Sequence, residues 1–459
     1  MIDTQSLKNK ILDLAIRGKL TRQLPDDGTA EELYEKIQEE KQALVEAGKI
    51  KKEKPLKEIE EGEVPFEIPE SWMWVKLSEV SYLTSGGQYE EIKEGIPYVK
   101  VADMNSSENQ YEIIKSTRYV DKCNTGIIPK GSIIFPKRGG AIATNKKRLV
   151  NETEIYVDTN IMGMTIIYPP TMSYIKIWFD SIDLGMLQSG TSIPQINNKD
   201  LYPLLIPLPP LAEQKRIVEI VEKLFVEIDT IKKLQTQYAA DAEILKSKLI
   251  DAAIQGKLTE QLPSDGTAEE LYQQIQTEKK ALISAGKIKK EKPLKEIEED
   301  EIPFEIPESW KWVRLGDISR RIWAGGDKPS DFTKEKDEAR TVPVVANGVN
   351  EDGILGYTSK PTADQNTITV AGRGTIGFTV IRSYNYCPVV RLIVIEQSNH
   401  IDPRYLKMFL QSMPESSVGS SIPQLTVPMI RPKLVPLPPL GEQTRIADKI
   451  QSYMEIIAN

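Results

Sequence analysis

Histidine and cysteine are scarce in this chain of 459 residues, which contains only His400, Cys123 and Cys387. A Ser-His-Asp or Cys-His site would have to use His400, and a histidine-rich metal cluster is excluded. Two cysteines in so long a chain cannot build a disulfide framework, which indicates a reducing compartment. We therefore expect no metal site and a cytoplasmic location.

Long apolar runs are also missing. The chain opens MIDTQSLKNKILDLAIRGKL, with polar residues every few positions, and no later run reaches the roughly 18 apolar residues of a membrane span. The phosphate loop GxxxxGK, the motif GxGxxG after a strand and the Asp/Asn-Pro-Pro-aromatic tetrapeptide of amino-methyltransferases are absent too. The sequence therefore predicts no membrane partner, no catalytic residues and no cofactor bound by this chain.

An excess of positive charge is the third absence, since 59 Lys and Arg face 67 Asp and Glu and give a formal net charge of −8. This balance argues against a nucleic-acid binder, because phosphate contacts need basic residues. The charge is unevenly spread: residues 64–212 hold 14 basic and 16 acidic residues, and residues 302–441 hold 16 and 14. The acidity lies outside these two blocks, so they remain open to DNA contact, although we expect weak binding by the chain alone.

A duplication of more than 200 residues is the main feature that is present. Residues 3–81 match residues 241–319 at 56 of 79 positions, and the segment 192–217 recurs near the C-terminus. Between the matching segments, residues 88–190 and 327–418 are nearly unrelated. A period this long is a duplicated unit, because solenoid repeats span roughly 20–50 residues. Two units that share a frame but differ in surface suit a bipartite recognition protein.

Heptad spacing predicts a long helix that starts near residue 213 and stops before Gly256. Residues 445–459 repeat its first half and residues 3–18 its second half, so we expect a second, broken helix antiparallel to the intact one. The chain would then be circularly organised with pseudo-two-fold symmetry. The alternative is two independent amphipathic helices on separate cores. The candidate seam and partner-binding residues are Ile217, Val221, Leu224, Ile228, Ile231, Leu245, Leu249, Ile446, Ile450, Leu7 and Ile11.

Short strand-like runs such as SIIFP and TITVAG, with a helix near the end, predict a mixed α/β (α+β) domain in each divergent region. The aromatic pairs at the entry to these domains, Trp72 with Trp74 and Trp310 with Trp312, are expected to be core anchors rather than stacking platforms. We divide the chain into a conserved helical region 1–63, a first variable block 64–212, a central helical region 213–301, a second variable block 302–441 and a C-terminal half-helix 442–459.

Basic and amide side chains gather in the predicted loops of both variable blocks. Neighbouring glycines allow the backbone to approach a phosphate, arginine can read guanine and glutamine can read adenine. Each of these side chains could equally have an ordinary solvated or turn-forming role. The candidate DNA contacts are Lys137, Arg138, Lys146, Lys147, Arg148, Ser192, Gln195, Arg373, Arg382, Ser421 and Gln424.

The order of these segments resembles the specificity (S, HsdS) subunit of type I restriction-modification systems. The resemblance rests on IPLPPLAEQKRI and VPLPPLGEQTRI, which each close a variable block, and on GKLT…TAEELY and PESWxWVxL after the long helix. It implies a non-catalytic subunit with two target recognition domains that read the halves of a split double-stranded DNA sequence. It also implies that two methyltransferase subunits, which carry S-adenosylmethionine, bind the conserved helices, and that restriction subunits complete the complex.

Two other functions compete with DNA recognition. A protein-interaction scaffold, with two variable binding domains on a coiled-coil frame, fits the acidic composition. An enzyme is the third possibility and would require activity of the isolated chain.

Overall fold

The computed structural model describes most of the chain, namely residues 1–52, 57–123, 125–189, 193–413 and 424–458. Its contacts divide the protein into unit 1 (Met1–Thr236) and unit 2 (Gln237–Asn459). The division falls inside the 44-residue helix α6 (Leu211–Ile254), so each unit contains part of this helix. Within the described ranges, no helix is long and apolar enough to cross a membrane.

Unit 1 combines strands from the first variable block with helices from both the block and the conserved regions. Its helices besides α6 are α1 (Thr4–Ile16), α2 (Ala30–Glu46), α3 (Leu77–Val80), α4 (Met172–Ser181) and α5 (Asn198–Leu201). Its strands are β1 (Met73–Lys76), β2 (Ser81–Ser85), β3 (Ile96–Val99), β4 (Tyr119–Val120), β5 (Ser132–Pro136), β6 (Arg148–Val150), β7 (Tyr156–Val157), β8 (Ile161–Ile166) and β9 (Leu205–Leu208).

Unit 2 has the same kinds of elements in the same sequence. Its helices besides α6 are α7 (Ala268–Ser284), α8 (Leu315–Ile318), α9 (Pro403–Ser412), α10 (Val427–Ile430) and α11 (Leu440–Ala458). Its strands are β10 (Lys311–Arg314), β11 (Ser319–Ala324), β12 (Val342–Val345), β13 (Ile354–Thr358), β14 (Thr367–Val370), β15 (Thr379–Arg382), β16 (Cys387–Pro388), β17 (Ile393–Gln397) and β18 (Leu434–Leu437).

The two variable blocks share one sheet topology despite their unrelated sequences. The main sheet has the antiparallel order β2-β8-β5-β6 in unit 1 and β11-β17-β14-β15 in unit 2. A three-stranded sheet, β4-β3-β7 or β13-β12-β16, contains one parallel pair in each unit. An antiparallel ladder, β1-β9 or β10-β18, joins the start of each block to its end. The predicted mixed α/β fold is confirmed in both units.

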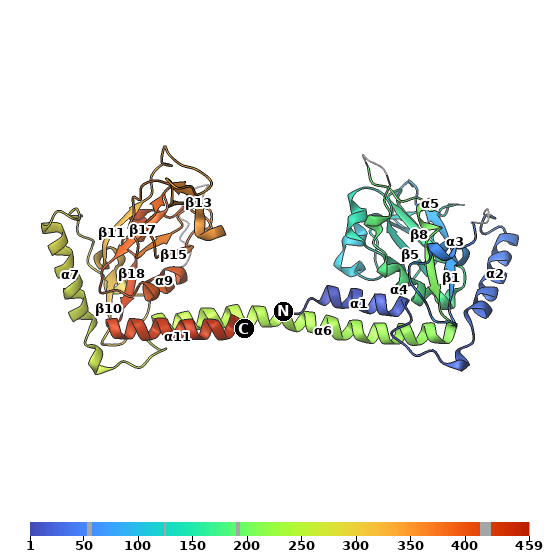
Figure 1. Ribbon diagram of the computed structural model, residues 1–459, viewed down its shortest axis with the longest axis horizontal. Helices are drawn as coiled ribbons and strands as arrows, with labels where there is room; N and C mark the ends of the chain where they lie inside the picture. The colour runs from blue at the N-terminus through green and yellow to red at the C-terminus, as the bar shows by residue number, and fades with distance from the viewer. Residues whose placement is uncertain (53–56, 124, 190–192, 414–423, 459) are drawn as a thin grey trace. The chain divides into compact units, whose positions relative to one another are not determined.

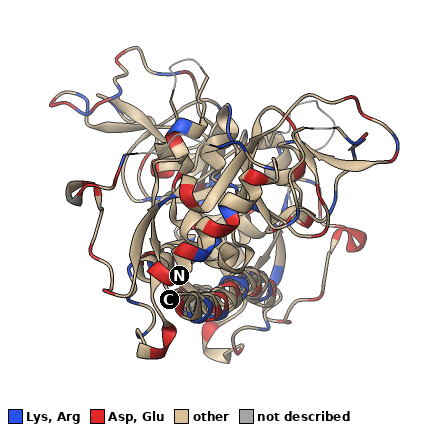
Figure 2. Cartoon of the chain, turned by 90° about the vertical axis from the view of Figure 1, so that its right-hand side faces the viewer, with Lys and Arg blue, Asp and Glu red and all other residues tan. Residues whose placement is uncertain are grey.

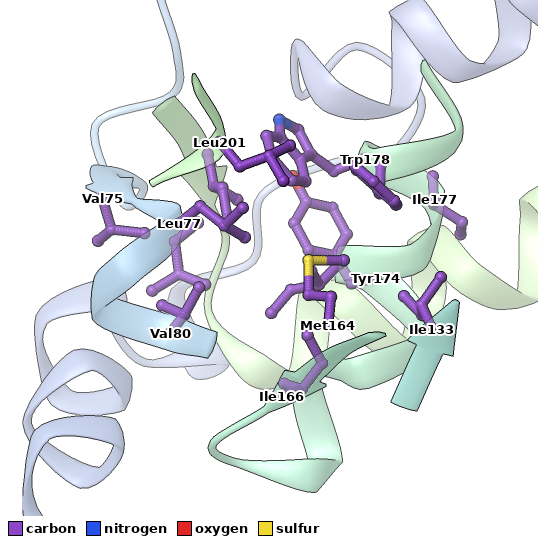
Figure 3. Packing of buried hydrophobic residues seen from close by; sticks show 14 of the residues in the cluster. Val75, Leu77, Val80, Ile133, Met164, Ile166, Tyr174, Ile177, Trp178 and Leu201 are labelled. Atoms are coloured by element: carbon purple, nitrogen blue, oxygen red, sulfur yellow. The ribbon is translucent and has the colours of Figure 1, made fainter. Parts of the chain in front are cut away.

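Burial on both faces explains why the inner strand β5 is apolar after Ser132. Ile133 and Phe135 enter a cluster with Tyr174 of α4, whereas Ile134 enters a second cluster on the opposite face of the sheet. In the first cluster, Tyr174 lies beside Met164 of β8 (Figure 3). In unit 2 the inner strand β17 follows the same rule, with Ile393 and Ile395 in one cluster and Val394 in a second, so both main sheets are covered on two sides.

Helix α1 in unit 1 and helix α11 in unit 2 each pack antiparallel to α6 (Figure 1). In unit 1, Lys8 Nζ of α1 lies 2.6 Å from Asp229 Oδ1, and Gln235 Nε2 donates to the carbonyl oxygen of Ile2 at 3.3 Å. In unit 2, Tyr238 Oη donates to the carbonyl oxygen of Ile457 at 3.2 Å. The predicted antiparallel packing is confirmed in each unit, while the circular arrangement and the pseudo-two-fold symmetry stay predictions.

The predicted helix seam was wrong at two positions. Leu7 is 38% exposed and Leu245 is 47% exposed, whereas α1 buries Leu12 and Ala15 instead. The reason is that α1 packs against α4 as well as α6, so its buried face is turned away from the heptad seam that the sequence indicates.

Candidate nucleic-acid interface

An exposed arginine follows an inner strand of the main sheet in each unit. Arg138 comes two residues after β5, and Arg373 comes three residues after β14. The next residue is Gly139 with a φ of +73° or Gly374 with a φ of +70°, a backbone conformation that residues with a Cβ rarely adopt. A Cβ at either glycine would meet nothing within 4 Å, so both Arg-Gly turns face open space.

In unit 1 the Arg-Gly turn lies beside residues 194–196, which precede the closing strand β9. Arg138 and Gln195 form an isolated antiparallel bridge, and the amide of Ile196 donates to the carbonyl oxygen of Lys137 at 2.9 Å. The Gln195 side chain is half-buried, and its Nε2 donates to Asn197 Oδ1 at 2.8 Å. The structure therefore brings Arg138 and Gln195 together, as candidates from distant parts of the sequence.

Unit 2 repeats this juxtaposition with one change. The amide of Leu425 donates to the carbonyl oxygen of Gly372 at 2.8 Å, as in unit 1. Here, however, Arg373 Nη2 donates to Gln424 Oε1 at 3.2 Å. Thr426 stands where unit 1 has the asparagine that binds its glutamine, which leaves Gln424 available to the arginine. Ser192 and Ser421, the other candidates of the SIPQ segments, lie outside the described residues.

Lys137 adds positive charge beside the turn of unit 1, and Lys146 is a further candidate of the same block. Lys137 Nζ donates to Ser85 Oγ at 2.9 Å, and burial, followed by the nearby charge of Arg138, lowers the pKa of Lys137. Lys146 Nζ donates to Asn105 Oδ1. Elsewhere on the protein, Lys and Arg are interspersed with Asp and Glu along helices and loops (Figure 2).

The prediction that Lys147 contacts DNA was wrong, because its side chain points inward. It is only 5% exposed, and its Nζ donates to the carbonyl oxygen of Ile182 at 2.6 Å and lies 4.9 Å from the ring centroid of Phe179. Burial lowers the pKa of Lys147 to about 8. Its neighbour Arg148 is half-buried and donates to the carbonyl oxygens of Lys147 and Met104, so part of its hydrogen-bonding capacity is also used internally.

The prediction that Arg382 contacts DNA was wrong for the same reason, because this residue is only 1% exposed. Its Nε donates to Thr369 Oγ1 at 3.0 Å, its Nη1 to Tyr384 Oη at 3.2 Å and its Nη2 to the carbonyl oxygen of Asp352 at 2.8 Å. A guanidinium with three internal partners stabilises β15 and is not free to contact DNA. The described candidates that remain exposed or half-buried are Lys137, Arg138, Lys146, Arg148, Gln195, Arg373 and Gln424.

A buried glutamate that the sequence analysis did not single out ties the frame to the first variable block. Glu213, at the start of α6, has no exposed surface. Its carboxylate accepts hydrogen bonds from Trp72 Nε1 at 2.8 Å, Thr21 Oγ1 at 2.8 Å and Gln23 Nε2 at 2.7 Å. The expected core anchor is confirmed for Trp72, which is 4% exposed, whereas its pair Trp74 is half-buried.

Unit 2 builds the same cluster from the repeated residues. Glu442 accepts from Trp310 Nε1 at 2.8 Å, Thr259 Oγ1 at 2.9 Å and Gln261 Nε2 at 2.8 Å. The motifs that carried the repeat in the sequence, PLPPLxEQ, GKLT and ESWxW, therefore meet at one point in each unit. Their exact recurrence around a lone acidic residue was the signal that could have identified this cluster.

The candidate partner-binding residues fall into two groups. Five of them form part of the cores of their own units and are unavailable to a separate subunit, namely Ile217, Val221, Ile228, Ile446 and Ile450. Four are half-buried, namely Leu224, Ile231, Leu249 and Ile11, while Leu7 and Leu245 are exposed. Large apolar side chains that the sequence analysis missed are also exposed on α6: Val226 and Leu234 in unit 1, and Ile244 in unit 2.

The cavities of the protein also repeat. A groove of about 780 Å³ lies between α2 and β1, and one of about 750 Å³ lies between α7 and β10. Residues 290–297 line the second groove, where Arg314 donates to the carbonyl oxygens of Lys295 and Glu296. Among the described residues, no group of three His, Cys, Asp or Glu is placed to hold a metal ion.

Known proteins with similar sequences share one role. Residues 69–237 and 307–459 match the family described as the type I restriction modification DNA specificity domain. The EcoAI specificity subunit of Escherichia coli is 28% identical over 98% of this chain and 89% of its own length. The EcoEI specificity subunit from the same species is 29% identical over 70% of this chain and 63% of its own length.

Solved structures show a similar fold. One chain, from work on complex assembly and conformational transition of the type I R-M system, has a TM-score of 0.61 and 20% identity and covers 86% of this chain and 93% of its own. The HsdS subunit from Thermoanaerobacter tengcongensis has a TM-score of 0.52 and 20% identity, with 86% and 92% coverage.

Proposed function

This chain belongs to the family of type I restriction-modification DNA specificity domains, and on that premise we propose that each of its units reads one half of a bipartite DNA target. The observation that carries the proposal is that two blocks with nearly unrelated sequences share one topology and place an exposed Arg-Gly turn at the same position. A common scaffold with divergent loops can present two base specificities from one chain.

The partners follow from the same premise. We propose that methyltransferase subunits, two in number, dock on the helical frame and supply S-adenosylmethionine, and that restriction subunits complete the complex. The exposed apolar residues Val226 and Leu234 of unit 1 and Ile244 and Leu245 of unit 2 support contact with another protein along α6. In this proposal the chain itself is non-catalytic and acts in the cytoplasm.

A block exchange tests the proposal. Residues 88–190 are replaced by the equivalent block of a relative with a different target, the complex with its methyltransferase is produced, and methylated adenines are mapped across a genome. We expect one half of the recognised sequence to change while the other half stays the same. Exchange of residues 327–418 should change only the other half, and unchanged methylation sites after both exchanges would contradict DNA recognition by the blocks.

A protein-interaction scaffold is the competing function, and the formal net charge of −8 favours it. Titration with salt separates the two functions, because DNA affinity falls steeply as salt displaces phosphate contacts. If the complete complex has no affinity for the mapped duplex at low salt, the scaffold is the better account.

A further inference from the structure

We infer that Arg138 and Arg373 bind the phosphate backbone of DNA at equivalent points of the two half-sites and that neither reads a base. This inference rests on the proposed function and assigns a role within it. Its starting point is that both arginines occupy the same place in the fold, after β5 or β14 and beside the glutamine of SIPQ.

The repetition itself points to phosphate. The two units must distinguish different half-sites, so residues that select bases are expected to differ between the variable blocks, as most residues of these blocks do. The sugar-phosphate backbone, in contrast, is the same in both half-sites. An arginine, a following glycine and a glutamine that recur in otherwise unrelated blocks therefore match the part of the DNA that also recurs.

The local geometry suits a phosphate. Gly139 and Gly374 have positive φ angles and no atom within 4 Å of where a Cβ would stand, so an anion can approach the main chain closely at either turn. Neither arginine forms an ion pair with any carboxylate among the residues that the structure describes, and both side chains are exposed. Their guanidinium groups are thus available to an external anion.

The glutamine distinguishes the two turns. Gln424 Oε1 accepts from Arg373 Nη2 and so acts as a positioning residue for that guanidinium. In unit 1, Gln195 is instead bound to Asn197, and among the described residues no side chain orients Arg138. Removal of the glutamine side chain should therefore weaken DNA binding in unit 2 and leave it almost unchanged in unit 1.

The test uses the complete complex with its methyltransferase subunits. The probes are the mapped duplex and a set of duplexes with single base-pair changes in each half-site. For Arg138→Ala and for Arg373→Ala we expect roughly tenfold weaker binding to every duplex, with the ranking of the duplexes preserved. The plot of log affinity against log salt should become less steep by about 1, as expected for the loss of one phosphate contact.

Controls separate this role from loss of fold and from base reading. Lys122→Ala removes an exposed charge elsewhere in unit 1 and should not change the ranking or the salt slope. Arg138→Lys and Arg373→Lys should retain most of the affinity, because a phosphate accepts a point charge. Gln424→Ala should weaken binding severalfold, and Gln195→Ala should not.

Two outcomes overturn the inference. If an arginine variant loses discrimination at one base pair while its salt slope is unchanged, that arginine reads a base. If neither affinity nor slope changes, the turns do not touch DNA. Both outcomes leave the proposed function intact, whereas failure of the unaltered complex to prefer any bipartite sequence would contradict the proposed function itself.

Discussion

The frame and the variable blocks of this protein are repeated in different ways. In the frame, individual contacts recur: Glu213 and Glu442 accept three equivalent hydrogen bonds each, and Arg216 and Arg445 each bind an aspartate of the loop before α2 or α7. In the variable blocks the strand order recurs, but most side chains do not. The frame therefore repeats its side-chain contacts in both units, whereas the variable blocks repeat the backbone topology and differ in most side chains.

The largest expected effect comes from the buried carboxylate of the frame. Glu213→Ala removes the shared acceptor of Trp72, Thr21 and Gln23 and leaves Trp72 Nε1 and Thr21 Oγ1 inside unit 1 without that partner, while Gln23 Nε2 keeps only its longer bonds to backbone carbonyls. We expect the free energy of unfolding of unit 1 to fall by about 3–5 kcal/mol. Hydrogen exchange resolved by peptide measures the loss unit by unit.

The matching variant Glu442→Ala should destabilise unit 2 by a similar amount and spare unit 1. The control is Glu219→Ala, which removes an exposed glutamate from the same helix and should change stability by less than about 0.5 kcal/mol. Equal exchange rates in Glu213→Ala and in this control would show that the frame is not held together by its repeated contacts.

The second effect tests the difference between internal and exposed arginines of one variable block. Arg382→Met removes three hydrogen bonds from a buried guanidinium, so we expect unit 2 to lose about 2–3 kcal/mol of unfolding free energy. Arg373→Met removes an exposed side chain and should cost less than about 0.5 kcal/mol. Denaturant unfolding of both variants measures the difference in unfolding free energy. Equal losses would contradict a stabilising role for the buried Arg382 side chain.

These two arginines show what the sequence can and cannot predict. Repeats, heptads and strand runs predicted the mixed α/β blocks, the antiparallel helices and the buried tryptophans, because each depends on a periodic pattern or an exact recurrence. A charged residue in a variable block carries no such pattern. Lys147 beside Lys146, and Arg382 at the end of β15, look like surface charges in the sequence, but the tertiary fold turns the side chains of Lys147 and Arg382 inward.

The same limit applies to the helices and the turns. The heptad pattern could not choose between Ile11 and the adjacent Leu12, because the choice depends on α4, which packs on α1 from the variable block. The equivalence of Arg138 and Arg373 was invisible because the surrounding residues differ. It emerges only when β5 and β14 are matched by their place in the sheet order.

The third effect concerns a lysine buried in the first variable block. Burial lowers the pKa of Lys147 to about 8 from a value of 10.5 in the unfolded chain. Between these two pH values the unfolded state binds the proton and the folded state does not, so the stability of unit 1 should rise with pH. The slope relative to Lys147→Met is at most about 1.4 kcal/mol per pH unit.

Chemical denaturation of both proteins from pH 7.5 to pH 10 measures this trend. Below about pH 8 the difference between them should be constant, because the lysine is protonated in both states. Lys146→Met is the control, since it removes a neighbouring lysine that bonds to Asn105 at the surface. A flat difference across the whole range would mean that the Lys147 ammonium keeps its charge inside the protein.

The smallest effect sharpens the comparison where the frame itself differs between the units. Lys8 of α1 pairs with Asp229 and lies 5.0 Å from the ring centroid of Phe225, but Ala458 stands where unit 2 would need the aspartate. Lys246, the counterpart of Lys8, pairs with Glu243 of its own helix. Because Asp229 is partly exposed, Lys8→Met should cost unit 1 about 0.5–1 kcal/mol at low salt and less at high salt.

A double-mutant cycle with Asp229→Asn isolates the ion pair from the aromatic contact. We expect a coupling free energy of about 0.5 kcal/mol that shrinks as salt is added, while a residual cost from Phe225 is insensitive to salt. Lys246→Met should change the stability of unit 2 by no more than a few tenths of a kcal/mol. A larger loss of unfolding free energy in unit 2 than in unit 1 would mean that the frame of unit 2 depends more on surface charge than the frame of unit 1.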